Sequence, residues 1–403
     1  MLLDNPRNDA RCVMLTGATG YVGSVLAAAL LARTSSKVIA PVRDKHAVTD
    51  VRARIAAELM ALGAEASLVD DTERLVVVDL PPREALSELA PTLRAHGVTE
   101  IVHSAGSVDY FNGNALQEVN IELTRALLSL GRAIEITRFV FISTAFSSGY
   151  TQRPIEETLH TEPEEDPTEY TRSKRMAERE VAESGLPYLI LRPSIVVGHS
   201  RTGQYKGRPY GIYQFLNAMD RLMLGHCLDA FHVVAPAREL SLVHQDALQD
   251  GFIGALRYLA DNAVMHLVSG QQQLPTMRDM VDMMLTDTAY LHEVSELHIY
   301  DSLADVPMKQ LSKRMRTWVE FSAVNTEIAT HTWDFQMPTL AALRQRGVVK
   351  TQDADRESLR ACLRAWVANN EKLAKQMTPG LKAPRTVEVA RWPSSLNARI
   401  GAE

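Results

Sequence analysis

Tyr170 and Lys174 are the two residues of this 403-residue chain whose types and spacing point most directly to chemistry. Residues four apart on a helix share a face, so the phenol and the ammonium group would lie side by side. A nearby ammonium favours the phenolate, which lowers the tyrosine pKa from a reference near ~10 and makes its proton transferable near neutral pH. Among eleven tyrosines, only Tyr170 has a lysine four residues later. The alternative is a solvated polar pair on a helix surface.

Ser143 and Thr144 end an apolar segment that predicts a strand. A doubly wound α/β sheet binds its ligands at the carboxyl ends of its strands, so a hydroxyl there could hydrogen-bond a substrate carbonyl beside Tyr170. Capping of the following loop is the alternative. Asn120 lies on a predicted helix over 115–133 and either bonds nearby backbone or positions a water for a proton relay. The first role is favoured, because buried amides usually serve backbone groups.

The stretch from Thr16 to Gly23 has glycines at positions 17, 20 and 23, between an apolar segment and an alanine- and leucine-rich one. This pattern predicts a strand, a tight turn and a helix. The first glycine permits the turn, the second lets backbone approach a pyrophosphate, and the third lets the helix pack closely on the strand. The helix N-terminus would then face the phosphates. A tight turn without a ligand is the alternative.

Arg43 and Asp79 close the second and third predicted strands. Arg43 stands twenty residues after Gly23, where a dinucleotide-binding fold recognises the adenosine ribose. An arginine there accommodates a 2′-phosphate, so the sequence favours NADPH over NADH. The neighbouring Asp44 could turn outward or take a ribose hydroxyl instead. Asp79 is predicted to meet the adenine amino group, or else to cap a helix.

Apolar segments and helical patterns alternate through the first half of the chain, which predicts an α/β fold with a Rossmann-type, doubly wound parallel sheet. The predicted strands are 12–15, 37–42, 75–78, 100–103, 138–143 and 188–191, with a seventh at 264–268. The predicted helices are 24–32, 45–62, 84–96, 115–133 and 168–184. We therefore expect an NAD(P)-binding Rossmann core over residues 1–198, to which the seventh strand is added.

The alternation breaks after Gly198. Residues 199–211 predict a long loop, helical patterns follow at 212–228 and 245–260, and the pattern is mostly helical from Pro275 onward. We expect a smaller, mostly helical C-terminal substrate-binding region over 199–263 and 269–335, C-terminal helices over 336–378 and a loose tail over 379–403. The clearest late helix is predicted over 355–377.

The bulk composition excludes several classes of protein. Apolar content of 46% and charged content of 23% are ordinary for a globular chain, and a net charge of -6 without a basic block argues against nucleic acid as a partner. The N-terminus lacks a signal-peptide pattern, and no apolar run is long enough to span a membrane, so we expect a cytoplasmic protein. Cys12, Cys227 and Cys362 read as reduced thiols, and no His or Cys spacing supports a metal site.

Together these motifs resemble the extended short-chain dehydrogenase/reductase family over about residues 10 to 270. Its motifs occur here in the family's order, at 16–23, Asp79, 103–106, 143–144, 170–174 and 192–194. The chain looks most like the thioester-reductase and fatty-acyl-reductase ("male sterility") branch, through Val42-Arg43 and the segments 141–145, 191–198 and 199–203. Sugar-nucleotide epimerases usually carry Val-Tyr-Gly where this chain has Ser147-Ser148-Gly149, which counts against a sugar substrate.

The resemblance implies an NADPH-dependent reductase of an acyl thioester, bound to coenzyme A or to a carrier protein, that forms an aldehyde or an alcohol. It implies Tyr170 as the general acid, assisted by Thr144 and Ser143, with Lys174 holding the ribose and tuning Tyr170. The implied cofactor contacts are Thr16, Gly17, Thr19, Gly20, Tyr21, Val22, Gly23, Arg43, Asp79, Leu80, Ser104, Ala105, Gly106, Asn120, Tyr170, Lys174, Pro193, Ser194 and Ile195. Arg201, Lys206 and Arg208 could meet phosphates of coenzyme A or a carrier arm, but a plain solvated loop is favoured, because surface charges usually do no more.

Two alternatives stay open. A dehydrogenase or epimerase of the same fold, acting on a ketone, a sterol or a sugar nucleotide, would use the same tyrosine, lysine and threonine. A non-catalytic NADP-sensing protein would keep the fold alone, although such proteins commonly lose the tyrosine or the lysine. No adenylation or carrier domain accompanies the reductase motifs, so we expect the acyl donor to be met in trans. Family members are often dimers, but no residue of this sequence indicates a homodimer.

Overall fold

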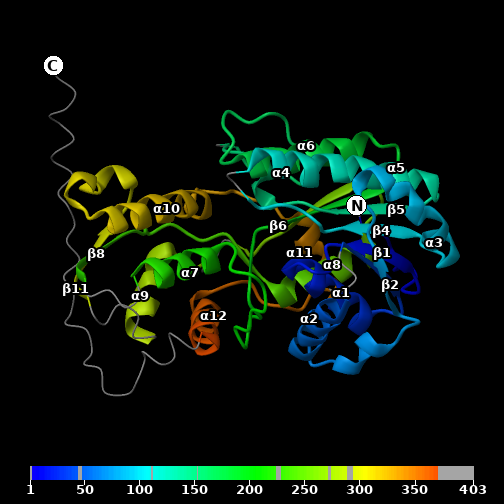
Figure 1. The fold of residues 1–403 in the computed structure, drawn as a ribbon, viewed down its shortest axis with the longest axis horizontal. Coiled ribbons are helices and arrows are strands. Elements are labelled where there is room, and N and C mark those ends of the chain that lie inside the picture. Colours follow the sequence, from blue (N-terminus) through cyan, green and yellow to red (C-terminus); the bar gives the residue numbers. More distant parts are fainter. Residues whose placement is uncertain are drawn as a thin grey trace.

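The computed structural model describes residues 2–43, 48–109, 112–151, 153–223, 228–270, 274–287 and 294–370. Two parts lie side by side along the long axis of the molecule (Figure 1). One is built around a central sheet, and the other contains helices α7, α9 and α10 and strands β8 and β11. Within these ranges no helix combines the length and the apolar character needed to cross a bilayer.

Seven strands of the described chain form one parallel sheet in the order β10-β6-β5-β4-β1-β2-β3. Their bounds are β1 Cys12–Thr16, β2 Lys37–Val42, β3 Leu75–Asp79, β4 Glu100–His103, β5 Arg138–Ile142, β6 Tyr188–Pro193 and β10 Ala263–Leu267. The chain winds outward from β1 to β3 and then returns to β4 on the other side of β1. Ligands of such sheets bind at the carboxyl ends of the strands beside this reversal. The predicted strands and the Rossmann-type fold are confirmed.

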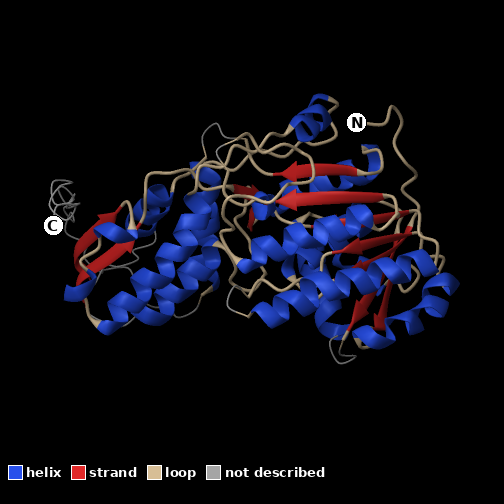
Figure 2. Ribbon diagram, turned by 90° about the horizontal axis from the view of Figure 1, so that it is seen from above, coloured by secondary structure: helices blue, strands red, loops and turns tan. Residues whose placement is uncertain are grey.

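Helices cover both faces of the sheet, as Figures 1 and 2 show. On one face α1 (Tyr21–Arg33), α2 (Val48–Ala61) and α8 (Gln245–Tyr258) share a core with Val13 and Leu15. The other core contains Met14, whose side chain leaves the opposite side of β1, as strand geometry requires. It is covered by η3 (Arg83–Leu89), α3 (Ala90–Ala95), α5 (Leu123–Ala133) and α6 (Glu169–Glu183).

Two predicted helices differ from the structure. The segment 84–96 is a 3-10 helix, η3, followed by α3, which starts afresh with Pro91 in its first turn. Proline lacks the N–H that an uninterrupted helix would need there, and it is tolerated in a first turn. The segment 115–133 is α4 (Gly113–Leu116), a π-helical turn η4 (Gln117–Glu122) and then α5. Of the helix predicted over 45–62, residues 45–47 lie outside the described ranges.

The second part is not wholly helical. Strands β8 (Leu228–Val234) and β11 (Val294–Tyr300) form a two-stranded parallel sheet at the end of the molecule farthest from the central sheet (Figures 1 and 2). They lie among α7 (Ile212–Met223), α9 (Met277–Asp287) and α10 (Lys313–Thr330). The predicted helix end at residue 228 was therefore wrong, because Leu228 begins β8. Short strands β7 (Ile195–Val197) and β9 (Leu242–His244) also pair, close to the carboxyl edge of β6.

The chain then returns to the sheet body at α11 (Pro338–Gln345), which packs on β10 and α8, whereas α12 (Arg356–Asn369) packs against α9 of the second part (Figure 1). A capping box between Asp355 and Ser358 starts α12, which confirms the predicted helix as far as residue 369. The rest of that prediction and the tail predicted over 379–403 lie outside the described residues. The remaining short helical turns are η2 (Ala66–Asp70), η5 (Ala145–Ser148), η6 (Leu303–Asp305) and η7 (Met308–Gln310).

Candidate active site

The turn between β1 and α1 needs glycine at two positions for different reasons. Gly17 has φ +79°, and a Cβ there would lie 2.7 Å from the backbone N of Ala105. A Cβ on Gly23 would lie 2.1 Å from the carbonyl O of Gly17. Gly20 is the N-cap residue of helix α1, and no side chain caps the helix there. Its first N–H groups are therefore available to an anion at the helix N-terminus.

A cavity of about 270 Å³ opens beside this turn at the carboxyl edge of the sheet. The walls come from the turn and from the segments that follow β4, β5 and β6, together with α6 and the loop that precedes α7. The structure thus brings together the predicted residues Gly17, Gly20, Tyr21, Val22, Gly23, Ser104, Gly106, Thr144, Tyr170, Ser194 and Ile195.

Two serine residues that line this cavity have unpaired hydroxyl groups. The Oγ atoms of Ser104 and Ser194 are buried, and neither has a hydrogen-bond partner among the described residues. An unpaired buried polar group is costly, so both are explained if a bound molecule supplies the partner. A dinucleotide, with its hydroxyls, amides and phosphates, fits these donors and the uncapped helix. The residues present therefore fit a nicotinamide dinucleotide.

Tyr170 is the second residue of α6, which begins with a capping box between Thr168 and Thr171. Lys174 follows one turn later and is buried, not part of a solvated surface pair. Its Nζ donates a 2.6 Å hydrogen bond to the carbonyl O of Ile142 and lies 4.1 Å from the ring centre of Phe141. Burial lowers the pKa of Lys174 to about 7, against the opposing charge of Glu178.

Of the two hydroxyl residues after β5, only Thr144 lines the cavity. Its Oγ1 accepts a 3.4 Å hydrogen bond from the backbone N–H of Phe146. The Ser143 hydroxyl instead donates to the carboxylate of Glu178. Ser143 thus joins α6 to the end of β5, and its hydroxyl is committed to a protein partner.

A buried ion pair that sequence reasoning missed lies behind Lys174. The carboxylate of Glu178, on the next turn of α6, accepts hydrogen bonds from Nε of Arg192 at 3.0 Å and from its Nη2 at 2.6 Å. Burial acts to raise the pKa of Glu178, but Arg192 and Ser143 outweigh it, and the net pKa lies below its ordinary value. The position of Glu178, four residues after Lys174, was the available signal.

Asn120 has the structural role that the sequence favoured. Its Oδ1 accepts from the N–H of Ser107 at 2.8 Å, and its Nδ2 donates to the carbonyl O of Ser107 at 3.0 Å. The same nitrogen donates to the Oγ of Ser173 at 2.9 Å. Asn120 therefore fixes the segment after β4 to α6, and holds the two walls of the cavity together.

Several expected cofactor residues lie around the cavity and do not line it. Thr16 Oγ1 is 2.8 Å from His103 Nδ1 and accepts from the N–H of Ala105 at 3.3 Å, so it joins β1 to β4. Arg43 and Thr19 are exposed near the turn. Pro193 ends β6 and does not line the cavity, whereas the next residue, Ser194, does.

Asp79 ends β3 opposite Val42 of β2, and Leu80 donates its N–H to the carbonyl O of Val42 at 2.7 Å. Pro82 occupies the N-cap position of the following helix η3, so Asp79 is not its N-cap. Asp44 lies outside the described residues.

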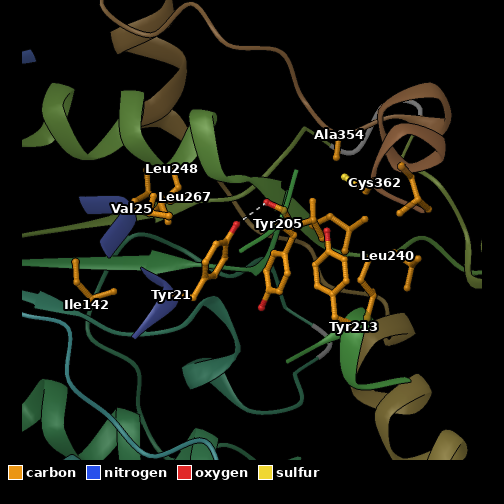
Figure 3. Packing of buried hydrophobic residues seen from close by; sticks show 14 of the residues in the cluster. Tyr21, Val25, Ile142, Tyr205, Tyr213, Leu240, Leu248, Leu267, Ala354 and Cys362 are labelled. Atoms are coloured by element: carbon orange, nitrogen blue, oxygen red, sulfur yellow. Dashed lines mark hydrogen bonds between the residues drawn. The ribbon is translucent and has the colours of Figure 1, made fainter. Parts of the chain in front are cut away.

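The loop before α7 covers the start of α1. The ring of Tyr205 lies 4.3 Å from that of Tyr21 and 3.7 Å from that of Tyr213, in a row that Figure 3 shows. The Tyr21 hydroxyl donates to Oε1 of Gln245 at 2.6 Å. Arg201, Lys206 and Arg208 of this loop are exposed. Tyr205 and Tyr210 line the cavity, and only the Gly- and Tyr-rich composition of the loop hinted at this.

A second, apolar pocket adjoins the first, and Phe146, Tyr170, Ile195 and Gly211 line both. Among the described residues, no group of His, Cys, Asp and Glu side chains is arranged to hold a metal ion.

Comparison with known proteins agrees with this geometry. The family model described as Male sterility protein matches residues 15–237. Sterol demethylase protein B of Methylococcus capsulatus is 31% identical over 191 residues, which are 46% of this chain and 51% of that protein. The chain spans about half or less of the length of the curated relatives it matches.

Two solved structures share the fold. The terminal R domain from the myxalamid PKS-NRPS biosynthetic pathway has 22% identity and a TM-score of 0.66, with 93% of each chain covered. The thiolation-reductase di-domain from an archaeal non-ribosomal peptide synthetase has 18% identity and a TM-score of 0.67, with 90% of this chain and 76% of that one covered. The chain belongs to the Male sterility protein family. The extended short-chain dehydrogenase/reductase class expected from its motifs, with a nicotinamide cofactor, is confirmed.

Proposed function

We propose that this member of the Male sterility protein family uses NADPH to reduce an acyl thioester, carried by coenzyme A or a carrier protein, to an aldehyde or an alcohol. One observation carries the proposal: Tyr170 lies where the glycine-turn cavity meets the apolar pocket. A dinucleotide in the first and an acyl group in the second would both reach the same phenol. The fold shared with the thiolation-reductase di-domain supports a carrier-bound substrate.

Bound NADPH would supply a hydride to the acyl carbonyl carbon. The N–H groups at the start of α1 would hold the pyrophosphate, while Ser104 and Ser194 would offer their unpaired hydroxyls to the same ligand. Arg43, directly after β2, would meet the 2′-phosphate, which favours NADPH over NADH.

Tyr170 and Thr144 hydrogen-bond the carbonyl oxygen and stabilise the oxyanion that develops there. Tyr170 then donates its proton, and the resulting hemithioacetal loses the thiol to give an aldehyde. Lys174, held by Ile142, keeps positive charge near the phenol and favours its ionisation. Glu178, paired with Arg192, holds Ser143 at the end of β5.

The substrate region is proposed to be the part of the chain over 199–263 and 269–335. Helices α7, α9 and α10 of this part supply one side of the apolar pocket, and the segment after β5 supplies the other. This arrangement supports the division of labour expected from the sequence, with the cofactor on the sheet body and the acyl group between the two parts.

A ketone-acting dehydrogenase is the second candidate, because a 31% identical relative carries the name Sterol demethylase protein B. The two candidates differ in substrate and share the tyrosine. Loss of NADPH absorbance would be followed with acyl-coenzyme A thioesters, acyl-carrier thioesters, aldehydes and sterol ketones. Tyr170→Phe serves as the test variant and Tyr188→Phe, at the start of β6, as its matched control.

Thioester-dependent oxidation that is lost in Tyr170→Phe and kept in Tyr188→Phe supports the reductase. Turnover of ketones with none of thioesters would overturn it and favour the dehydrogenase. NADH oxidised as efficiently as NADPH would overturn the assignment of the cofactor.

A further inference from the structure

The apolar pocket beside Tyr170 has a composition that restricts what it can bind. Its volume is about 50 Å³. Phe146 and Ile195 line it together with Tyr170, and so do Phe215 of α7 and Met277 and Met280 of α9. No charged side chain is found among the described residues that line it.

The threonines of the pocket do not offer their hydroxyl protons to a ligand. Thr171 Oγ1 donates to the carbonyl O of Thr168 at 2.7 Å, and Thr326 Oγ1 donates to the carbonyl O of Val234 at 3.4 Å. Thr168 Oγ1 in turn donates to Thr171 Oγ1 at 3.4 Å. A hydroxyl-rich ligand such as a sugar would lose its hydrogen bonds to water here without replacement, which is unfavourable. The chemistry of the pocket therefore suits a hydrocarbon group.

The pocket is also small. A protein cavity of about 150 Å³ holds benzene, so a volume of about 50 Å³ corresponds to roughly two or three carbon atoms. Met277 and Met280 lie three residues apart on α9, and both are almost fully buried, as is Phe215. All three side chains line the pocket and limit the space left inside it.

We infer that the enzyme selects acyl groups with a short apolar end, and that Met280 and Phe215 set the length limit. The inference rests on the proposed function, because it gives the substrate class of the same site. The thioester carbonyl would lie at Tyr170, with its hydrocarbon end between α7 and α9. A long linear fatty-acyl chain and a sugar nucleotide are both disfavoured by this pocket.

The test is a chain-length series of saturated acyl-coenzyme A substrates, from two to twelve carbons, with NADPH. The wild-type kcat/KM is expected to peak at about two to four carbons and to fall at least about tenfold by eight carbons. Met280→Ala removes part of the pocket lining and should shift the optimum upward by about two carbons. The ratio of eight-carbon to four-carbon activity should then rise roughly tenfold, the gain expected for burying two more methylene groups.

Met283→Ala is the matched control, because Met283 is equally buried on α9 but does not line the pocket. Met283→Ala should lose a similar amount of unfolding free energy to Met280→Ala, because both leave a cavity, but it should leave the chain-length profile unchanged. A wild-type optimum at eight carbons or more, or the same shift in both variants, would overturn the inference while leaving the thioester reductase intact.

Binding of linear alkanols to the enzyme with NADPH, measured by calorimetry, separates the pocket from the reaction. Affinity that rises to about four carbons and then levels off, with a later plateau in Met280→Ala, supports the length limit. If alkanols behave in this way and no thioester is turned over, the pocket inference stands and the proposed function fails. Affinity that keeps rising through eight carbons in the wild type would overturn the length limit.

Discussion

Lys174 donates the hydrogen bond from its Nζ to the carbonyl O of Ile142, the last residue of β5, at 2.6 Å. The amine is buried next to the ring of Phe141, and this burial lowers its pKa to about 7 although Glu178 acts in the opposite direction. Lys174 is therefore close to its titration point at neutral pH. A group in that state changes its charge readily when an anionic ligand arrives.

The first prediction concerns stability against pH. The folded pKa of Lys174, about 7, lies below its ordinary value of 10.5, so the unfolded chain binds more protons between these values. The cost of burying the charge is full below about pH 7 and is relieved as the pH rises toward 10.5. The melting temperature of the wild type should therefore rise by several degrees relative to Lys174→Met between pH 7 and pH 10. A constant difference would show that Lys174 does not titrate in this range.

The second prediction compares Ser194 and Ser104, whose hydroxyls are unpaired among the described residues, with Ser173, whose hydroxyl has protein partners. Ser194→Ala removes a hydroxyl without a partner among the described residues, so urea unfolding should show no loss of stability. Its Kd for NADPH should rise about fivefold, the effect of one hydrogen bond of about 1 kcal/mol. Ser104→Ala should behave in the same way.

Ser173→Ala is the contrasting variant, because the Ser173 hydroxyl donates to the carbonyl O of Tyr170 at 2.7 Å and accepts from Asn120 at 2.9 Å. It should lose about 1–3 kcal/mol of unfolding free energy. Stability lost in Ser194→Ala, or unaltered NADPH binding in both ligand-facing variants, would argue against a dinucleotide in this cavity.

The sequence predicted the central sheet well because each buried parallel strand is a short apolar run bounded by turn residues. It could not separate Ser143 from Thr144. Successive residues of an extended backbone point to opposite sides, and Thr144 has φ -145° and ψ 146°. Only the register of β5 decides that Thr144 faces the cavity and Ser143 faces Glu178.

Two other features depend on contacts that no local pattern reveals. The β8–β11 pair joins Leu228 to Val294, and neither strand alone signals its partner. The pair of Glu178 and Arg192 is buried at the junction of a helix and a strand, whereas charged residues in a sequence are normally expected at the surface. The bonds of Asn120 to the backbone of Ser107 follow the general rule that buried amides serve backbone groups.

The third prediction concerns the choice of cofactor. Arg43 follows β2 directly and is exposed. Arg43→Ala should raise the KM for NADPH by about tenfold to a hundredfold, as expected for the loss of a charge-assisted phosphate contact, and should leave the KM for NADH unchanged. Arg316→Ala, which removes the same charge from an exposed position on α10, is the control. Equal effects of Arg43→Ala on both cofactors would refute a 2′-phosphate contact.

The last prediction concerns Glu58, a buried carboxyl group of α2. Burial raises the pKa of Glu58 to about 7, against the charge of Lys206 and a hydrogen bond with Gln245. Gln245 in turn accepts from the Tyr21 hydroxyl, so the protonation of Glu58 is coupled to the start of α1. No pattern in the sequence marked this group.

The folded pKa of Glu58 lies above its ordinary value of 4.5, so its contribution to stability is complete below pH 4.5 and is lost as the pH rises through about 7. Glu58→Gln keeps the shape of the side chain and cannot ionise. It should match the wild type near pH 4.5 and exceed its unfolding free energy by up to about 3 kcal/mol at pH 8. Urea unfolding at both pH values measures this, with Glu88→Gln, an exposed residue of η3, as the control. If the difference between Glu58→Gln and the wild type is the same at both pH values, Glu58 keeps an ordinary pKa, and the charge of Lys206 and the hydrogen bond from Gln245 outweigh its burial.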